Sequence, residues 1–233
     1  CVVAMSEFIA GSEEAFVQMM NDKAKELGMN DTCFKNCHGL DQDGHITSSY
    51  DISLMSRELL NKYPEVTKYT TIWMESQLSN TNKLIKNYKG ATGLKTGSTS
   101  LALYNLSASA TRDDLSLIAV IMKAPSTKVR FAEAQKLLDY GFGKFAFKSF
   151  GNKDDLIKTI NVSKGVKSQV DVVLENNSGA LIEKNKINQV SQSINLSDNI
   201  SAPISAGQKL GEATFSLDDK IVASVNLVAK SDV

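Results

Sequence analysis

The chain has 233 residues and 42% hydrophobic content, enough to bury one large core or two smaller ones. Its 26 basic and 26 acidic residues cancel, which argues against nucleic acid or an anionic membrane as the main partner, because either favours a basic surplus. No apolar run approaches the length of a transmembrane helix.

Helical periodicity dominates the first half of the chain. Residues 1–10 predict a buried helix, and we expect the true start of the protein to lie upstream of Cys1. Residues 11–28 predict a second helix, which Ser12 caps and Gly28 closes.

Residues 31–47 are predicted to be irregular, and a third helix follows from Ser48 or Ser49 to about Tyr63. Asp51 is placed to complete a capping box with the serine that begins this helix. Its inward-facing positions are predicted to be Ile52, Met55 and Leu59. A short helix over residues 65–69 comes next.

A Lys-Thr-Gly triplet lies within residues 93–99, and two apolar runs follow it. Residues 101–110 and 115–122 predict an antiparallel strand pair with the triplet at its head. A helix is then expected from about Lys128 to Tyr140, with Gly141-Phe142-Gly143 ending it.

Beyond about residue 148 the helical period gives way to alternation of apolar and polar residues. Strands are predicted at residues 156–162, 169–174, 213–217 and 221–228, the last two forming a hairpin through Asp218-Asp219. We therefore expect two domains, residues 1–147 and an all-β domain of residues 148–233.

The cysteines Cys33 and Cys37, with His38 beside them, could be read as metal ligands or as a disulfide. The metal interpretation lacks a fourth ligand and the usual spacing, and the disulfide would close a very tight loop. Both are disfavoured.

The order of landmarks resembles the D-alanyl-D-alanine carboxypeptidases, which are low-molecular-mass penicillin-binding proteins, and is closest to sporulation-type Gram-positive members. The resemblance covers nearly the whole chain. It is carried by Ile9–Asn21, His38-Gly39-Leu40-Asp41, Ser48-Ser49-Tyr50-Asp51, Asn80-Thr81-Asn82-Lys83-Leu84, Gly93–Gly97 and Leu137–Phe142.

This resemblance implies an α/β (α+β) domain of the serine β-lactamase and transpeptidase type, with an antiparallel sheet and helices, followed by the small β domain. It implies a serine acyl-enzyme that removes the terminal D-Ala from peptidoglycan stem peptides ending in D-Ala-D-Ala, with β-lactams as inhibitors and no cofactor. It also implies a place outside the cytoplasm at the cell wall, with membrane attachment only through a C-terminal anchor that these residues do not contain.

The same resemblance assigns substrate-binding roles to Lys95, Thr96, Gly97, Ser98 and Arg130. The ammonium of Lys95 would supply positive charge, the hydroxyl of Thr96 would receive a substrate carboxylate, and Gly97 would let the ligand approach the backbone. Arg130 matches a family arginine near the carboxylate pocket, and Ser98 varies within the family.

Two departures from the family pattern are visible. No serine has a lysine three residues later, so the Ser-x-x-Lys nucleophile is absent, and it and the Ser-x-Asn motif are expected upstream of Cys1. Leu103 stands where many relatives carry glycine. Ser224-Val225-Asn226 is read as a chance match in the β domain. A non-catalytic wall-binding scaffold and a β-lactamase are the alternative functions.

Overall fold

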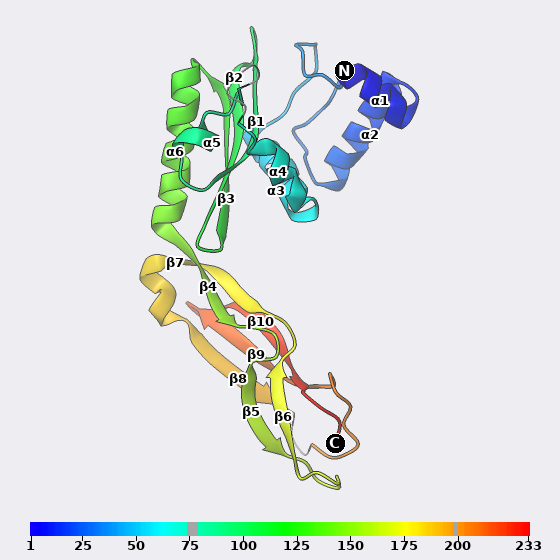
Figure 1. Cartoon of the computed structure of the whole chain (residues 1–233), viewed down its shortest axis with the longest axis vertical. Helices are drawn as coiled ribbons and strands as arrows, with labels where there is room; N and C mark the ends of the chain where they lie inside the picture. Colours follow the sequence, from blue (N-terminus) through cyan, green and yellow to red (C-terminus); the bar gives the residue numbers. More distant parts are fainter. Residues whose placement is uncertain (74–78, 198–199) are drawn as a thin grey trace. The chain divides into compact units, whose positions relative to one another are not determined.

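The structure is a computed structural model that describes residues 1–73, 79–197 and 200–233. The chain divides into two compact units, Cys1–Gly143 and Lys144–Val233 (Figure 1). The first unit is a mixture of helices and one antiparallel sheet, and the second is built almost entirely of strands. The predicted fold class is confirmed.

The first unit begins with helices whose caps match the sequence. They are α1 (Val2–Ala10), α2 (Glu13–Glu26), α3 (Ser49–Lys62), the 3₁₀ turn η1 (Pro64–Val66), α4 (Thr67–Thr70) and α5 (Leu84–Asn87). The Ser12 hydroxyl accepts a hydrogen bond from the Ala15 amide, and the Ser48 hydroxyl accepts one from the Asp51 amide. Both serine caps are therefore confirmed.

Three finer expectations about these helices are wrong. The carboxylate of Asp51 does not complete a capping box, because it accepts bonds from the Asp31 amide and the Thr32 hydroxyl. Helix α1 forms, but Phe8 is 90% exposed, because α1 packs mainly on α2 and none of the described residues covers its outer face. Met55 is exposed as well, since the buried side of α3 turns Ser56 toward the sheet.

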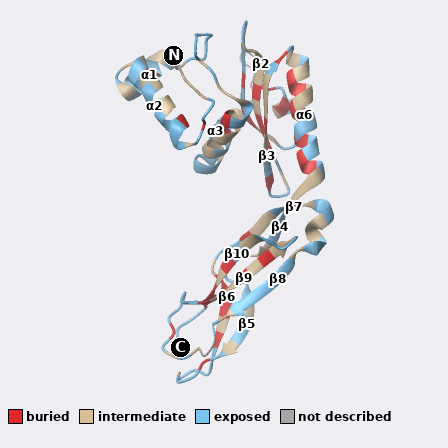
Figure 2. Cartoon of the chain, turned by 180° about the vertical axis from the view of Figure 1, so that it is seen from behind, coloured by how far each residue is buried: buried red, intermediate tan, exposed pale blue. Residues whose placement is uncertain are grey.

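The sheet of the first unit contains β1 (Ala91–Thr99), β2 (Leu103–Arg112) and β3 (Leu115–Ala124), antiparallel and in that order. Helix α6 (Thr127–Lys144) covers one face of this sheet and α3 covers the other (Figure 1). The buried residues gather where α6 meets the strands (Figure 2), with Leu106, Ala108 and Leu138 all nearly inaccessible. The predicted strand pair is confirmed as β2 and β3, and the triplet lies on β1, a separate edge strand that precedes the pair.

The predicted end of the last helix at Gly141 is wrong, because α6 continues to Lys144. A Cβ atom at Gly141 would lie 2.5 Å from Cδ1 of Leu117, and Phe142 is buried. Gly141 permits close packing of the helix on the strand. In the sequence alone, the same glycine looks like the end of a helix.

The second unit has two sheets. One has five strands in the order β5-β6-β10-β9-β8, and the other pairs β4 with β7. The strands are β4 (Phe145–Gly151), β5 (Leu156–Asn161), β6 (Gln169–Leu174), β7 (Ser178–Glu183), β8 (Ser191–Leu196), β9 (Lys209–Leu217) and β10 (Lys220–Ala229), with the 3₁₀ segment η2 (Lys184–Gln189) after β7.

Alternation of side chains builds the core of this unit. Val172, Ala213 and Leu227 are fully inaccessible, and Phe150 stacks on Phe215 with ring centroids 4.2 Å apart. The four predicted strands and the hairpin at Asp218-Asp219 are confirmed. None of the helices among the described residues is long and apolar enough to cross a membrane.

Candidate active site

The Lys-Thr-Gly triplet lies on β1, the edge strand of the three-stranded sheet, and its side chains alternate in exposure. Lys95 and Gly97 are exposed, whereas Thr96 is only 8% exposed. Such alternation follows from the strand period of two residues. The Lys95 ammonium donates to the carbonyl of Thr96 at 2.7 Å, and no acidic partner is found for it among the described residues. Lys95 is therefore a free positive charge at the strand edge.

A segment before α5 covers the side of β1 that has no neighbouring strand. The Thr96 hydroxyl donates to the hydroxyl of Thr81 at 2.7 Å. Asn82 is fully buried, and its amide nitrogen donates to the carbonyl of Gly93 at 2.9 Å. These bonds fix the position of the edge strand without adding another strand to it.

Arg130 reaches this part of the sheet from α6 and is only 6% exposed. Its Nη1 donates to the carbonyls of Gly97 at 3.3 Å and Asn105 at 3.1 Å. The guanidinium lies over the rings of Phe131 and Tyr104, at 4.9 and 5.6 Å from their centroids. Burial lowers the pKa of this guanidinium, and Tyr104 opposes that shift.

In the described part of the chain no carboxylate is found to influence Arg130, and its Nε is buried without a hydrogen-bond partner. A cation held only by carbonyl dipoles and ring faces keeps its net charge, so this site favours an anion. Above Gly97 the space is open, because a Cβ built there would meet no atom within 4 Å.

Two hollows adjoin this strand end and share Asn105 and Met122 in their walls. A groove of about 220 Å³ lies between α3 and the sheet and is lined by Lys95, Thr96 and Gly97. A larger hollow of about 610 Å³ lies between the loop of residues 39–49 and the β1–β2 turn. The groove gives a ligand room to approach the triplet, and the larger hollow adjoins it through Asn105 and Met122.

Asp41 of the His-Gly-Leu-Asp segment ties that loop to the β1–β2 turn. Its carboxylate accepts a hydrogen bond from the Thr99 hydroxyl at 2.6 Å and from the Leu101 amide at 3.3 Å. Asn36, in the same loop, donates to the carbonyl of Leu40 at 3.0 Å. The loop is thus anchored next to the triplet.

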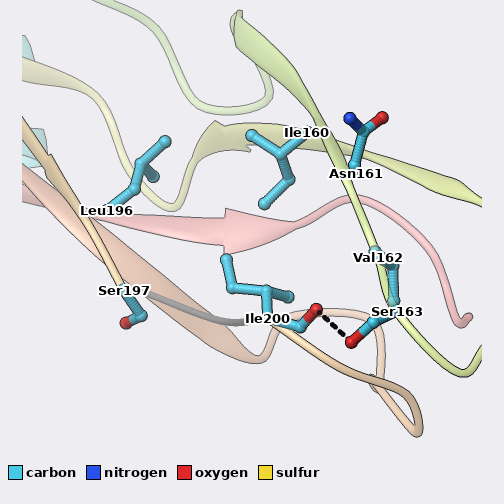
Figure 3. A pocket seen from close by; sticks show the side chains of 7 residues that line it. All are labelled: Ile160, Asn161, Val162, Ser163, Leu196, Ser197 and Ile200. Carbon is cyan, nitrogen blue, oxygen red and sulfur yellow. Dashed lines mark hydrogen bonds between the residues drawn. The ribbon is translucent and has the colours of Figure 1, made fainter.

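The second unit has a hollow of about 470 Å³ of a different character (Figure 3). Its walls are formed by Ile160, Asn161, Val162, Ser163, Leu196, Ser197 and Ile200. The Ser163 hydroxyl donates to the carbonyl of Ile200 at 3.3 Å. None of these side chains is charged, so this hollow offers no acid, base or fixed ion for catalysis.

The sequence motif around Cys33, Cys37 and His38 does not form a metal site. The three cysteines are free thiols, and within the described ranges no group of His, Cys, Asp and Glu is arranged to hold a metal. Instead, the Cys37 amide and thiol both lie 3.2 Å from the Glu13 carboxylate, which His38 approaches to 3.8 Å. The Cys37 hydrogen bonds are the main cause of a lowered pKa at Glu13.

Of the residues singled out from the sequence, Lys95, Thr96 and Gly97 line one groove, and Arg130 donates to the Gly97 carbonyl. The Thr96 hydroxyl is engaged with Thr81. Ser98 is exposed on the same strand. Sequence reasoning did not select Asn105 as a site residue. The only signal for it was an asparagine inside a strand, where that residue type is uncommon.

A family model described as D-alanyl-D-alanine carboxypeptidase matches residues 1–126. The chain belongs to this family. The family model of the C-terminal domain of penicillin-binding protein 5 matches residues 145–233. The match thus extends over both units, as the sequence landmarks predicted.

Individual relatives agree with this assignment. The D-alanyl-D-alanine carboxypeptidase DacF of Bacillus subtilis is 39% identical over 99% of this chain and 62% of its own length. The structure of penicillin-binding protein 5 from Haemophilus influenzae has 32% identity and a TM-score of 0.72, over 99% of this chain and 69% of that one. Penicillin-binding protein D2 of Listeria monocytogenes, solved in its ampicillin-bound form, has 32% identity and a TM-score of 0.56, over 60% of each chain.

The sequence spans about 60% of the length of the curated relatives it matches. It contains the Lys-Thr-Gly strand and the β domain of the family, and no Ser-x-x-Lys motif.

Proposed function

We propose that this chain forms the Lys-Thr-Gly wall and the β domain of a serine-type D-Ala-D-Ala carboxypeptidase. The enzyme would remove the terminal D-Ala of peptidoglycan stem peptides through an acyl-enzyme, and β-lactams would acylate the same serine. The nucleophile and the Ser-x-Asn motif would be supplied by residues outside the printed sequence.

The buried Arg130 is the observation that carries this proposal. The substrate of such an enzyme ends in a free carboxylate, which needs fixed cationic partners in a partly desolvated cleft. Arg130 has no acidic partner among the described residues, and the carbonyls of Gly97 and Asn105 hold it next to the Lys95 strand edge. We assign the carboxylate to this end of the strand, with Lys95, Thr96, Gly97, Ser98 and Arg130 as substrate-binding residues.

The role that each residue would play in substrate binding follows from the chemistry of its side chain. Lys95 supplies a mobile positive charge beside the groove, and Gly97 leaves room for the ligand to lie against the strand. Thr96 would have to turn its hydroxyl from Thr81 toward the ligand. The protein would work outside the cytoplasm, on peptidoglycan, and the similarity to the sporulation-type relative favours a role in sporulation.

The β unit, residues 145–233, is proposed to act as a spacer or docking module. The hollow lined by Ile160 and Ile200 carries no charged side chain, and the residues assigned to the substrate all lie in the first unit.

The proposal is tested with a protein that carries this chain and the residues encoded immediately before it. Fluorescent penicillin should label that protein and should leave the 233-residue chain unlabelled. Lys95→Ala should lower both penicillin acylation and peptide hydrolysis. Arg130→Ala should act chiefly on substrates with a free C-terminal carboxylate, by about 2–4 kcal/mol, or roughly 30- to 1000-fold in kcat/KM.

The matched control for Arg130→Ala is the same peptide with an amidated C-terminus, whose hydrolysis the variant should leave nearly unchanged. Wild-type kcat/KM of Arg130→Ala toward diacetyl-Lys-D-Ala-D-Ala would remove Arg130 from the site. If the longer protein is not labelled by penicillin at all, a non-catalytic wall-binding function takes the place of the enzyme.

A further inference from the structure

Asn105 occupies an irregular point in the sheet. On β2, Tyr104 pairs with Ala124 and Leu106 pairs with Ile121, so Asn105 alone lies opposite two residues of β3. One residue opposite two is a β-bulge, which leaves backbone groups of the bulged strand without ladder partners.

The Asn105 side chain supplies the missing partner. Its Oδ1 accepts a hydrogen bond from the Lys123 amide at 2.7 Å, and its Nδ2 donates to the carbonyls of Ala102 at 3.0 Å and Leu103 at 3.4 Å. Leu103 and Lys123 have φ angles of 52° and 55°, a left-handed conformation that residues with side chains rarely adopt. One amide therefore holds two unfavourable backbone positions on neighbouring strands.

The backbone of Asn105, in contrast to its side chain, contacts the triplet strand and Arg130. It pairs with Gly97 of the Lys-Thr-Gly triplet, and these two register partners each present a carbonyl to Nη1 of Arg130. The Asn105 carbonyl makes the shorter of the two bonds, at 3.1 Å. A displacement of Asn105 would therefore move the Arg130 guanidinium and the adjoining part of the triplet strand together.

We propose that Asn105 is a positioning residue for the anion-binding end of this cleft. Its side chain fixes the bulge and the β1–β2 turn, and the fixed backbone then sets the guanidinium of Arg130 relative to Gly97. The consequence for the substrate carboxylate rests on the proposed function, whereas the positioning itself rests on the contacts around Asn105.

The test uses the ¹⁵N-labelled 233-residue chain and its Asn105→Ala and Asn105→Asp variants. The Lys123 amide reports the bulge, and the Nε–Hε group of Arg130, which is buried without a partner, reports the guanidinium. Thr111→Val is the matched control, because Thr111 makes a 2.8 Å hydroxyl contact to Ser116 between the same two strands at their far end.

In Asn105→Ala the exchange of the Lys123 amide should be faster by about tenfold, the equivalent of ~1.4 kcal/mol, and the Arg130 Nε–Hε signal should move or broaden. Asn105→Asp keeps an acceptor for the Lys123 amide but loses both donations from Nδ2, so it should retain more of the Lys123 protection than Asn105→Ala while it loosens the β1–β2 turn. Thr111→Val should change neither the Lys123 protection nor the Arg130 signal. Asn105→Ala is also made in a Leu103→Gly background, where glycine adopts the left-handed angle freely, so that poor folding of the single variant does not decide the result.

An Arg130 signal that stays in place in Asn105→Ala, or moves equally in Thr111→Val, overturns the positioning role. An Asp variant that loses the Lys123 protection as fully as the Ala variant overturns the role of Oδ1. Titration with N-acetyl-D-alanyl-D-alanine separates the two proposals. If the dipeptide leaves the wild-type Arg130 signal unchanged while the Asn105→Ala substitution shifts that signal, positioning stands and the carboxylate role of Arg130 fails. If the dipeptide shifts the wild-type Arg130 signal while Asn105→Ala leaves it in place, the carboxylate role stands and the positioning role fails.

Discussion

Asp51 should be the most sensitive single polar position in the first unit. Its side chain is 1% exposed, and one oxygen, Oδ2, accepts bonds from the Asp31 amide at 2.9 Å and the Thr32 hydroxyl at 2.6 Å. These bonds join the first turn of α3 to the chain that leads into the His-Gly-Leu-Asp loop. Asp51→Ala removes the acceptor of both bonds; the Asp31 amide is left without it, and the Thr32 hydroxyl keeps only its 2.8 Å contact to the Thr47 hydroxyl.

The magnitude follows from these contacts. A hydrogen bond to a charged group contributes about 1.5–3 kcal/mol, so the loss of two should cost about 3–5 kcal/mol in the free energy of unfolding. The helix N-terminus adds ~0.3–1 kcal/mol for a negative charge in its first turn. Asp51→Asn keeps an oxygen for both donors and should cost about 1–2 kcal/mol.

Urea unfolding followed by the fluorescence of Trp73 measures this effect, because the single tryptophan lies in the first unit. With a slope of about 1–3 kcal/mol per molar urea, the midpoint of Asp51→Ala should fall by on the order of 1–5 M. The exposed Asp43→Ala on the neighbouring loop is the control and should shift it little. A double-mutant cycle with Thr32→Val should give a coupling of about 1.5–3 kcal/mol. Additive effects in that cycle, or equal midpoints for Asp51→Ala and wild type, would refute the reasoning.

Two further predictions concern the second unit and the loop. A Cβ at Gly211 on β9 would lie 2.2 Å from the Asn195 carbonyl oxygen, so Gly211→Val should destabilise the β unit by about 1–3 kcal/mol, seen as an earlier circular-dichroism transition. The Trp73 transition should stay in place, and a parallel shift would contradict the independence of the two units. Burial, aided by His38 and opposed by Asp41, lowers the pKa of His45 below its ordinary 6.5, and its Nδ1 accepts from the Lys35 amide at 3.0 Å. Its contribution to stability is therefore complete above pH 6.5 and is lost as the pH falls from 6.5 toward the lower pKa of the folded state. His45→Gln should flatten that pH dependence and His38→Gln should retain most of it; an unchanged profile in His45→Gln would show that other groups cause it.

Local signals predicted much of the fold. The serine caps at Ser12 and Ser48 depend only on residues within one helical turn, and the alternating strands β6 and β10 depend on a period visible in ten residues. Strands β4, β7 and β8 were missed. β8 is a polar edge strand, exposed along nearly its whole length, so its structure comes from pairing with β9 and leaves no apolar pattern to read.

Local sequence signals also identified part of the candidate site, the Lys-Thr-Gly strand. The Lys-Thr-Gly strand is a local pattern, and its place on an exposed edge follows from the strands after it. The setting of Arg130 depends on Gly97 and Asn105, which lie 33 and 25 positions away in the sequence. The hydrogen bond from the Thr96 hydroxyl to the Thr81 hydroxyl likewise joins residues 15 positions apart. No local propensity encodes such contacts, because they exist only when the sheet, α6 and the segment before α5 are assembled.

The choice of partners for Arg130 has an electrostatic consequence. A carboxylate in place of the carbonyls of Gly97 and Asn105 would have stabilised the buried guanidinium more strongly and would also have neutralised it. Carbonyl dipoles orient the guanidinium and leave its full charge, at the expense of stability, as the lowered pKa reflects. An anion that enters beside Gly97 recovers part of that loss, because it replaces the water that burial removed. Under the proposed function, the same unpaired charge that weakens the fold would select a negatively charged ligand, and Asn105, which supplies one of the two carbonyls, would determine where that charge lies.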